Sequence, residues 1–173
     1  MSHSDYLKKF IRDVPDFPHP GILFRDITPL LRDASARRKV VAALATLAPA
    51  HLDAVVAVEA RGFLFGAPLA DMLNVPLVLI RKPGKLPGET RAVNYALEYG
   101  NGTLQMQKDD LPTGAQIFLV DDLLATGGTL AAACELLEEA NAEIVQIACL
   151  IELSELEGRA KLKERTFDAL LSY

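Results

Sequence analysis

Two adjacent carboxylates, Asp121 and Asp122, stand between an apolar run, Ile117–Val120, and the segment Thr126–Thr129 (TGGT). The apolar run predicts a buried strand, and the Gly-Gly pair indicates a turn at which the next helix begins. A helix N-terminus presents unpaired amides and the positive end of its dipole, and both favour a phosphate group. Glycines let the backbone approach the anion, and threonine hydroxyls add hydrogen-bond donors. We therefore predict a phosphate site here.

The two carboxylates indicate what else this ligand carries. Beside a phosphate they would repel it, so we expect them to bind sugar hydroxyls or a divalent cation. A ligand with a phosphate, vicinal hydroxyls and bound magnesium satisfies every part of the run. The alternative is a strand end whose Asp caps the next helix, with glycines that only shape a turn. The whole run favours the ligand site over this alternative.

The surrounding pattern predicts the elements that hold this site. Apolar strands are expected at Ala54–Val58, Leu77–Ile80, Ile117–Val120 and Ile144–Leu150. Helical periodicity separates them near 62–73 and 128–140. Strands that are apolar throughout, with helices between them, are typical of an α/β fold with a mostly parallel sheet flanked by helices. Ligands of such sheets bind at the carboxyl ends of the strands. At 173 residues the chain suits one domain, 1–173.

Three further segments complete the predicted organisation. Apolar residues at helical spacing predict a helix near residues 4–14, which ends at the proline-rich segment that follows. Residues 22–27 read as a short extended segment, and a second helix ends before Pro49. The interval from about 82 to 107 is rich in Pro and Gly and reads as a long loop with two short strands. We interpret this interval as a lid over the site, since long loops in compact chains are usually lids or disordered segments.

Bulk composition narrows the class of protein. The net charge of −5 argues against a nucleic-acid-binding surface, which normally carries a basic stripe. Cys134 and Cys149 lack metal-ligand spacing and read as buried free thiols in a reducing compartment. No apolar run reaches the roughly 20 residues that a membrane span needs. We expect a cytoplasmic protein without a membrane or nucleic-acid partner.

The run Val120–Thr129 resembles the phosphoribosyl-diphosphate-binding motif of the type I phosphoribosyltransferases. Other segments are similar to the adenine phosphoribosyltransferases of that family: Pro15–Asp26, Glu59–Gly66, Ile80–Gly88 and Leu97–Gly100. The resemblance covers nearly the whole chain in order. It implies transfer of a phosphoribosyl group from 5-phosphoribosyl 1-diphosphate to adenine, with Mg2+, giving AMP and diphosphate in purine salvage. It also implies an N-terminal hood over the base, at about residues 1–33.

By this resemblance, Asp121 and Asp122 hold the ribose hydroxyls, and magnesium is held mainly through the substrate. The 5′-phosphate lies on the loop formed by Ala125, Thr126, Gly127, Gly128 and Thr129. Arg61 belongs to the loop that grips the diphosphate with its forked donors. Read alone, an Arg after a strand is more often part of a surface ion pair. Some relatives carry Ser where this chain has Ala60, so a hydroxyl contribution is absent there.

A basic cluster follows the predicted strand Leu77–Ile80: Arg81, Lys82 and Lys85. On sequence alone, a solvated loop explains this cluster as well as a functional site does. The resemblance implies that the cluster neutralises the leaving diphosphate, with Arg81 as the strongest candidate.

The resemblance also assigns the base end of the site. The Phe24 ring would stack on adenine, while the backbone near Leu23 and Arg25 would hydrogen-bond its edge. The alternative is a core Phe and a surface ion pair between Arg25 and Asp26. Glu98 would transfer the proton of the base, with its pKa raised when the lid closes over it. Read alone, Glu98 is a solvated loop residue.

Other functions fit the sequence less well. The segment from Gly84-Lys85 to Thr90 lacks the adjacent Lys and Ser/Thr of a nucleoside-triphosphate P-loop. Some proteins of this fold are transcriptional regulators, but they usually carry an added DNA-binding domain and a basic face.

The helical stretch Gly62–Ala70 is apolar on every side. A small domain covers only one face of such a helix, so we predict a homodimer packed through it.

Overall fold

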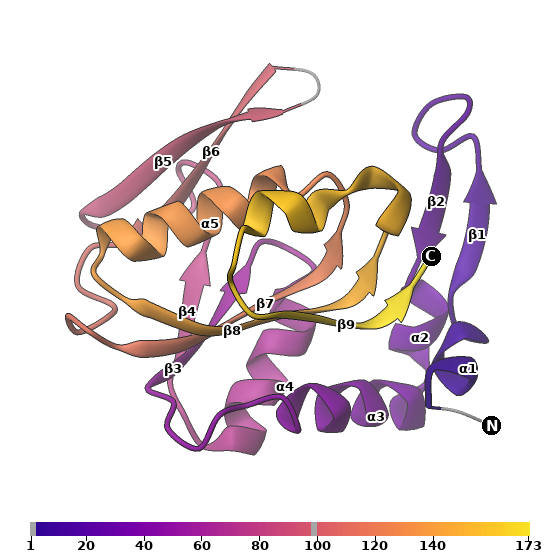
Figure 1. Cartoon of the computed structure of the whole chain (residues 1–173), viewed down its shortest axis with the longest axis horizontal. Coiled ribbons are helices and arrows are strands. Elements are labelled where there is room, and N and C mark those ends of the chain that lie inside the picture. The colour runs from indigo at the N-terminus through magenta and orange to yellow at the C-terminus, as the bar shows by residue number, and fades with distance from the viewer. Residues whose placement is uncertain (1–2, 98–99) are drawn as a thin grey trace.

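Five parallel strands form the central sheet, in the order β4-β3-β7-β8-β9 (Figure 1). The computed structural model describes residues 3–97 and 100–173. The strands are β3 (Ala54–Val58), β4 (Leu77–Ile80), β7 (Gln116–Leu124), β8 (Glu143–Glu152) and β9 (Phe167–Ser172). The predicted α/β fold with a mostly parallel sheet is confirmed.

Helices cover both faces of this sheet. One face packs against α3 (Ala34–Ala45) and α4 (Phe63–Leu73). The short helices α1 (His3–Lys8) and α2 (Thr28–Arg32) contribute to the same core. The other face packs against α5 (Gly128–Glu139). Neighbouring residues of β3 point to opposite faces: Val55 joins the α3–α4 core, whereas Val56 joins the α5 core. This alternation is the two-residue period of a strand buried on both sides.

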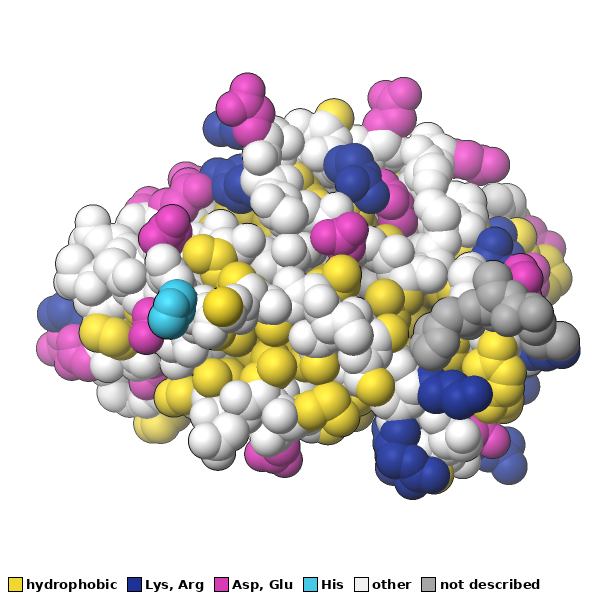
Figure 2. All heavy atoms as spheres, turned by 60° about the horizontal axis from the view of Figure 1, so that its bottom comes forward, with side chains coloured by type: hydrophobic (Ala, Val, Ile, Leu, Met, Phe, Trp, Pro, Cys, Tyr) yellow, Lys and Arg dark blue, Asp and Glu magenta, His cyan; other side chains and the backbone are white. Residues whose placement is uncertain are grey.

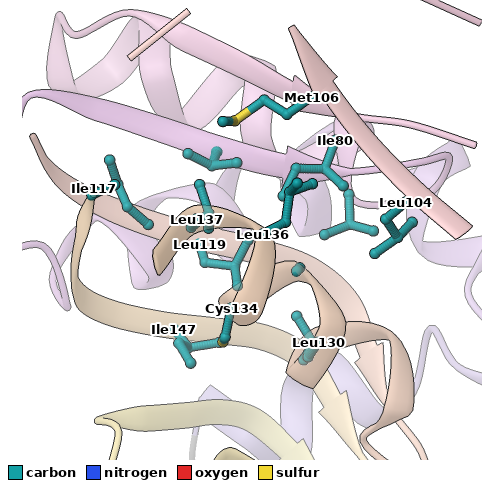
Figure 3. Packing of buried hydrophobic residues seen from close by; sticks show 14 of the residues in the cluster. Ile80, Leu104, Met106, Ile117, Leu119, Leu130, Cys134, Leu136, Leu137 and Ile147 are labelled. Carbon is teal, nitrogen blue, oxygen red and sulfur yellow. The ribbon is translucent and has the colours of Figure 1, made fainter. Parts of the chain in front are cut away.

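Helix α5 presents an apolar stripe to the sheet. Leu130, Ala133, Cys134 and Leu137 are all buried, as their spacing of three and four residues predicts. Figure 3 shows this stripe among side chains of the surrounding strands, with Ile117 and Leu119 of β7, Ile147 of β8, Ile80 of β4 and Leu104 and Met106 of β6. Truncation of a fully buried leucine such as Leu137 to Ala costs about 2–5 kcal/mol. This packing holds the start of α5 at the carboxyl ends of the strands.

The interval 82–107 is more regular than the sequence indicated. Most of it forms an antiparallel hairpin of two eight-residue strands, β5 (Thr90–Leu97) and β6 (Gly100–Gln107). These strands are longer than the two short ones that we expected. The hairpin is ordered by packing, because Val93, Leu104 and Met106 are buried in the α5 core. Among the described residues of this interval, only the connection from Lys82 to Glu89 lacks strand structure.

The predicted helix near 4–14 is wrong beyond Lys8. After α1 the chain turns and forms β1 (Arg12–Pro15), which pairs antiparallel with β2 (Leu23–Asp26). Ion pairs join both pairs of opposite charged residues: Arg12 Nε lies 3.0 Å from Asp26 Oδ2, and Arg25 contacts Asp13. Cross-strand pairs of opposite charge stabilise a hairpin, and these decide its register. This β1–β2 hairpin is the hood. In Figure 1 the hood lies at the right of the view, and the β5–β6 hairpin lies at the upper left.

Three elements near the end of the sequence were not predicted. Strand β9 forms the sheet edge, and two 3₁₀ turns precede it, η1 (Ser154–Leu156) and η2 (Gly158–Leu162). Their apolar residues are too few and too irregularly spaced for periodicity to identify them. No helix among the described residues is long and apolar enough to cross a membrane.

Candidate active site

A cleft of about 550 Å3 opens at the carboxyl ends of β3 and β7. Asp121 and Asp122 line it from β7, which continues through the pair to Leu124. Both are nearly buried, with 8% and 5% of their surface exposed. Asp121 Oδ1 accepts a hydrogen bond of 2.8 Å from the Asp122 amide, which orients the first carboxylate. The structure thus places both predicted carboxylates at one cleft and, beyond the prediction, buries them.

The environment raises the pKa of both carboxyls above the usual range. For Asp121 the main cause is burial, and the neighbouring Asp122 charge adds to it. For Asp122 burial again dominates, opposed by the guanidinium of Arg61. Carboxyl groups whose pKa is shifted by burial and by a specific charge partner occur preferentially at functional sites.

Arg61 connects two parts of the site. Its Nε forms an ion pair with Asp122 Oδ2 at 2.8 Å. This buried oxygen has no other partner among the described residues, so it can accept a further hydrogen bond from a ligand. The Arg61 guanidinium also lies 5.5 Å from the centre of the Phe24 ring in the hood. Arg61 therefore stands between the carboxylate pair and the hood.

Gly62 makes this arrangement possible by close approach. A Cβ at this position would lie 2.5 Å from the carbonyl oxygen of Val58 and 3.0 Å from Asp121 Oδ1. Any side chain at position 62 would push the start of α4 away from β3 and β7. Arg61 would move with it, so the absence of a side chain holds Arg61 beside Asp122.

The loop Ala125–Thr129 forms the opposite wall of the cleft. Gly127 has φ of +80°, a left-handed conformation that favours glycine, and α5 begins at Gly128. No side chain caps this helix start, and its first turn carries no acidic residue. Its amides and helix dipole are therefore available to an anion, as predicted for a phosphate.

The basic cluster has a partner that sequence reasoning missed. Glu59, at the end of β3, accepts from the amide of Lys82 at 3.0 Å and from Arg81 Nε at 3.2 Å. Burial acts to raise the pKa of Glu59, but these hydrogen bonds outweigh it and hold the pKa below its usual value. The signal in the sequence was an acid placed directly after a strand, across from a basic loop.

The structure divides the cluster into two groups. Lys82 lines the cleft, whereas Arg81 and Lys85 do not. Arg81 is held by Glu59, and its Nη1 donates to the carbonyl of Lys85 at 3.0 Å. These two cations therefore lie at the rim, behind the residues that form the wall.

None of the three predicted hood residues lines the cleft, and only Phe24 contacts a residue that does. Phe24 packs edge-on against Phe17, at 5.1 Å between ring centres, and faces Arg61. The side chain of Arg25 pairs with Asp13 and not with Asp26, and Leu23 is 46% exposed. Only the Phe24 side chain is thus placed toward the carboxylate site.

The predicted proton-transfer residue, Glu98, lies outside the described residues. The hairpin that carries it in the sequence does border the site. Tyr95 of β5 and Gly102, Thr103 and Leu104 of β6 all line the cleft.

Known proteins resemble this chain over nearly its whole length. The phosphoribosyl transferase domain family matches residues 33–170. An adenine phosphoribosyltransferase from Roseiflexus castenholzii is 55% identical over 168 residues, which cover 96% of this chain and 98% of that protein.

Solved structures agree. The adenine phosphoribosyltransferase from Thermoanaerobacter pseudethanolicus has a TM-score of 0.94 and 46% identity, over 98% of this chain and 99% of that one. The enzyme from Saccharomyces cerevisiae, complexed with adenine and an imino-altritol bisphosphate, has a TM-score of 0.93 and 38% identity, over 98% of each chain. The chain therefore belongs to the phosphoribosyltransferase family and, within it, to the adenine phosphoribosyltransferases.

Proposed function

We propose that this protein joins adenine to the ribose of 5-phosphoribosyl 1-diphosphate and releases AMP and diphosphate. The observation that carries the proposal is the buried Asp121–Asp122 pair, which shares one cleft with the uncapped start of α5. A ligand with both hydroxyl groups and a phosphate can bind the carboxylate pair through its hydroxyls and the start of α5 through its phosphate. A sugar phosphate has this combination, and the relatives from Roseiflexus castenholzii and Thermoanaerobacter pseudethanolicus are adenine phosphoribosyltransferases.

The ribose phosphate binds between the two walls of the cleft. The loop of Ala125, Thr126, Gly127, Gly128 and Thr129 receives the 5′-phosphate on its amides and threonine hydroxyls. Asp121 and Asp122 accept hydrogen bonds from the ribose hydroxyls. Asp122 Oδ2 supports this role, because this buried oxygen has only the Arg61 ion pair among the described residues and can accept from a hydroxyl as well.

Magnesium fits this site as a companion of the substrate. Within residues 3–97 and 100–173, no group of three or more His, Cys, Asp or Glu side chains is arranged to hold a metal ion. Asp121 and Asp122 supply hard oxygen atoms, but two carboxylates leave most of the coordination to diphosphate, hydroxyl groups and water. When bound with the substrate, magnesium would neutralise part of the negative charge on the diphosphate.

The cations around the cleft stabilise the diphosphate as it leaves. Arg61 and Lys82 line the cleft and reach the diphosphate directly. Arg81 and Lys85 add positive potential from the rim. A ring nitrogen of adenine bonds to the anomeric carbon as the bond from that carbon to the diphosphate oxygen breaks. Negative charge accumulates on the diphosphate in this step, where preorganised cations contribute most.

The hood binds the base. Phe24 stacks on adenine, and the backbone at Leu23 and Arg25 pairs with its edge. The hood contacts the cleft at Arg61, whose guanidinium lies 5.5 Å from the centre of the Phe24 ring. Glu98 accepts the proton that the base loses, while the hairpin β5–β6 limits the access of water.

A homodimer packed through α4 is part of the proposal. Figure 2 brings the α3–α4 side forward and shows hydrophobic side chains gathered across the middle of this face. Leu64 and Met72 of α4 are 43% and 53% exposed, while Phe65 and Leu69 are buried against the sheet. A helix that is apolar all round needs a second covering surface, and a second copy of α4 supplies one. The buried free thiols of Cys134 and Cys149 support a location in the reducing cytoplasm.

One assay tests the proposed reaction. The purified protein is mixed with adenine, 5-phosphoribosyl 1-diphosphate and magnesium, and AMP is quantified by chromatography. We expect AMP and diphosphate in equal amounts. The variant Asp121→Asn, which preserves size but not charge, provides the control for a contaminating activity. AMP formation that is absent, or equal in the wild type and the variant, would refute the proposed function.

A further inference from the structure

The phosphate loop touches a distant segment of the chain through backbone alone. A Cβ on Gly127 would lie 2.3 Å from the carbonyl oxygen of Gly158, at the start of η2. Conversely, a Cβ on Gly158 would lie 2.0 Å from the carbonyl oxygen of Ala125 and 2.9 Å from the Gly127 amide nitrogen. Both contacts are too short for any side chain, so the two glycines set the spacing between loop and η2.

The residue after Gly158 ties this contact to the sheet. Arg159 forms a two-pronged ion pair with Glu152, with Nε–Oε1 at 3.0 Å and Nη2–Oε2 at 2.7 Å. Its Nη1 donates to the carbonyl of Phe167 at 3.1 Å, and the guanidinium lies over the Phe167 ring at 4.7 Å. A fork held at three acceptors has little freedom to move. Arg159 thus fixes Gly158 relative to β8 and β9.

The anchor and the loop share a strand pair. Glu152 ends β8 and lies opposite Leu124, the last residue of β7. The phosphate loop starts at the next residue, Ala125, and Leu162 of η2 is fully buried against the α5 core. Figure 1 shows the 3₁₀ segment running beside the start of α5. The loop is therefore held from the sheet below and from η2 at its side.

We propose that residues 154–162 form a brace that sets the position of the 5′-phosphate loop, with Gly158 as its contact and Arg159 as its positioning residue. This inference rests on the proposed function for the identity of the ligand. Neither residue lines the cleft, so each acts through the backbone of Ala125 and Gly127. Amide hydrogen bonds to a phosphate require distances of about 2.7–3.2 Å, so a small shift of the loop weakens several of them together.

The decisive variant is Gly158→Ala. Its added methyl group must push η2 and the loop apart, and a displacement of about 1 Å can reduce turnover by about 10²-fold. We expect kcat/KM for 5-phosphoribosyl 1-diphosphate to fall by about 10²-fold and the affinity for ribose 5-phosphate, measured by calorimetry, to fall at least about tenfold. The KM for adenine should stay within about twofold, because Gly158 contacts Ala125 and Gly127, and Arg159 contacts Glu152 and Phe167, all of them outside the hood.

Gly114→Ala is the matched control. Gly114 has φ of +79°, lies in the turn before β7, and has nothing within 4 Å of the position that an added methyl group would take. The substitution strains the backbone and lowers the melting temperature without touching the loop. We expect its KM for 5-phosphoribosyl 1-diphosphate to equal that of the wild type. Loss of stability alone is thereby separated from loss of positioning.

A second variant covers the case in which Gly158→Ala does not fold. Arg159→Lys retains the charge but loses the fork, and we expect it to raise the KM for 5-phosphoribosyl 1-diphosphate about three- to tenfold with little change for adenine. A folded Gly158→Ala or Arg159→Lys protein with unchanged affinity for ribose 5-phosphate would overturn the brace, as would equal losses for both substrates. Failure of the proposed reaction is recognised separately, because the wild type would then make no AMP while the ribose 5-phosphate titrations still test the brace.

Discussion

The guanidinium of Arg25 lies 4.0 Å from the centre of the Tyr173 ring, and this contact joins the hood to the edge of the central sheet. Tyr173 follows β9, and its backbone exchanges hydrogen bonds with Glu152 and Ser154. Arg25 lies in β2, next to Phe24. The aromatic ring thus stabilises the strand that we propose to bind adenine.

Removal of this ring should affect the base and not the sugar. A cation–π contact contributes about 0.5–2 kcal/mol, so Tyr173→Ala is expected to raise the KM for adenine about three- to tenfold. The KM for 5-phosphoribosyl 1-diphosphate should remain unchanged. Tyr173→Phe keeps the ring and should behave as the wild type in the same steady-state measurements. Equal increases for both substrates in Tyr173→Ala would show that the contact serves general stability only.

Replacement of Asp121 and Asp122 by Asn should abolish activity and leave a protein at least as stable. A carboxyl whose pKa is raised by folding is most stabilising below the pKa of the unfolded chain, about 3.9, and that stability is lost as the pH rises through the folded pKa. The wild type therefore loses stability between pH 4 and pH 7 through this pair, and the double variant does not.

Thermal unfolding at pH 4 and at pH 7 tests whether ionisation of this pair destabilises the folded protein. The melting temperature of the double variant should exceed that of the wild type at pH 7, and the difference should shrink at pH 4. A variant that kept its activity but lost stability would indicate that the carboxylates serve only to cap the turn.

Glu98→Gln should lower turnover by about 10²–10⁴-fold, the usual range for general acid–base catalysis. The substitution removes the proton acceptor and keeps the size of the side chain. Binding of 5-phosphoribosyl 1-diphosphate should barely change, as equilibrium titration can measure. Near-normal turnover would show that Glu98 is a solvated residue without a role in proton transfer.

Adenine should be preferred over hypoxanthine and guanine by at least about a hundredfold in kcat/KM. A 6-oxopurine needs a donor at the edge where adenine carries its amine, and β8 with Leu153 contains no Lys or Arg to supply one. Backbone carbonyls of the hood accept from an amine but not from a carbonyl oxygen, and an unpaired buried polar group costs about 1–3 kcal/mol. Competition assays with the three bases would reveal comparable efficiencies if the hood were assigned wrongly.

The dimer should depend on the exposed face of α4. Light scattering at micromolar concentration is expected to give twice the chain mass for the wild type and the monomer mass for Leu64→Glu, because a buried unpaired charge opposes association. Leu156→Glu, at a residue of similar exposure outside this face, is the control and should remain dimeric. A monomeric wild type would remove the dimer from the proposal.

The sequence by itself determined four strands of the parallel sheet and the glycine-rich start of α5, because these depend on contiguous residues. The apolar run Ile117–Val120 indicates a buried strand, and the glycines that follow Thr126 indicate where α5 begins. Periodicity likewise identified the buried strands, which are apolar on both faces.

Tertiary structure decided which distant residues meet at the site. The pairing of Arg61 with Asp122, of Glu59 with Arg81, and of Gly127 with Gly158 joins segments that the sheet brings together from separate parts of the chain. Local pattern also misled at β1, where cross-strand ion pairs with β2 outweighed helical spacing. Such contacts depend on packing and register across elements, so no window of sequence contains the information that specifies them.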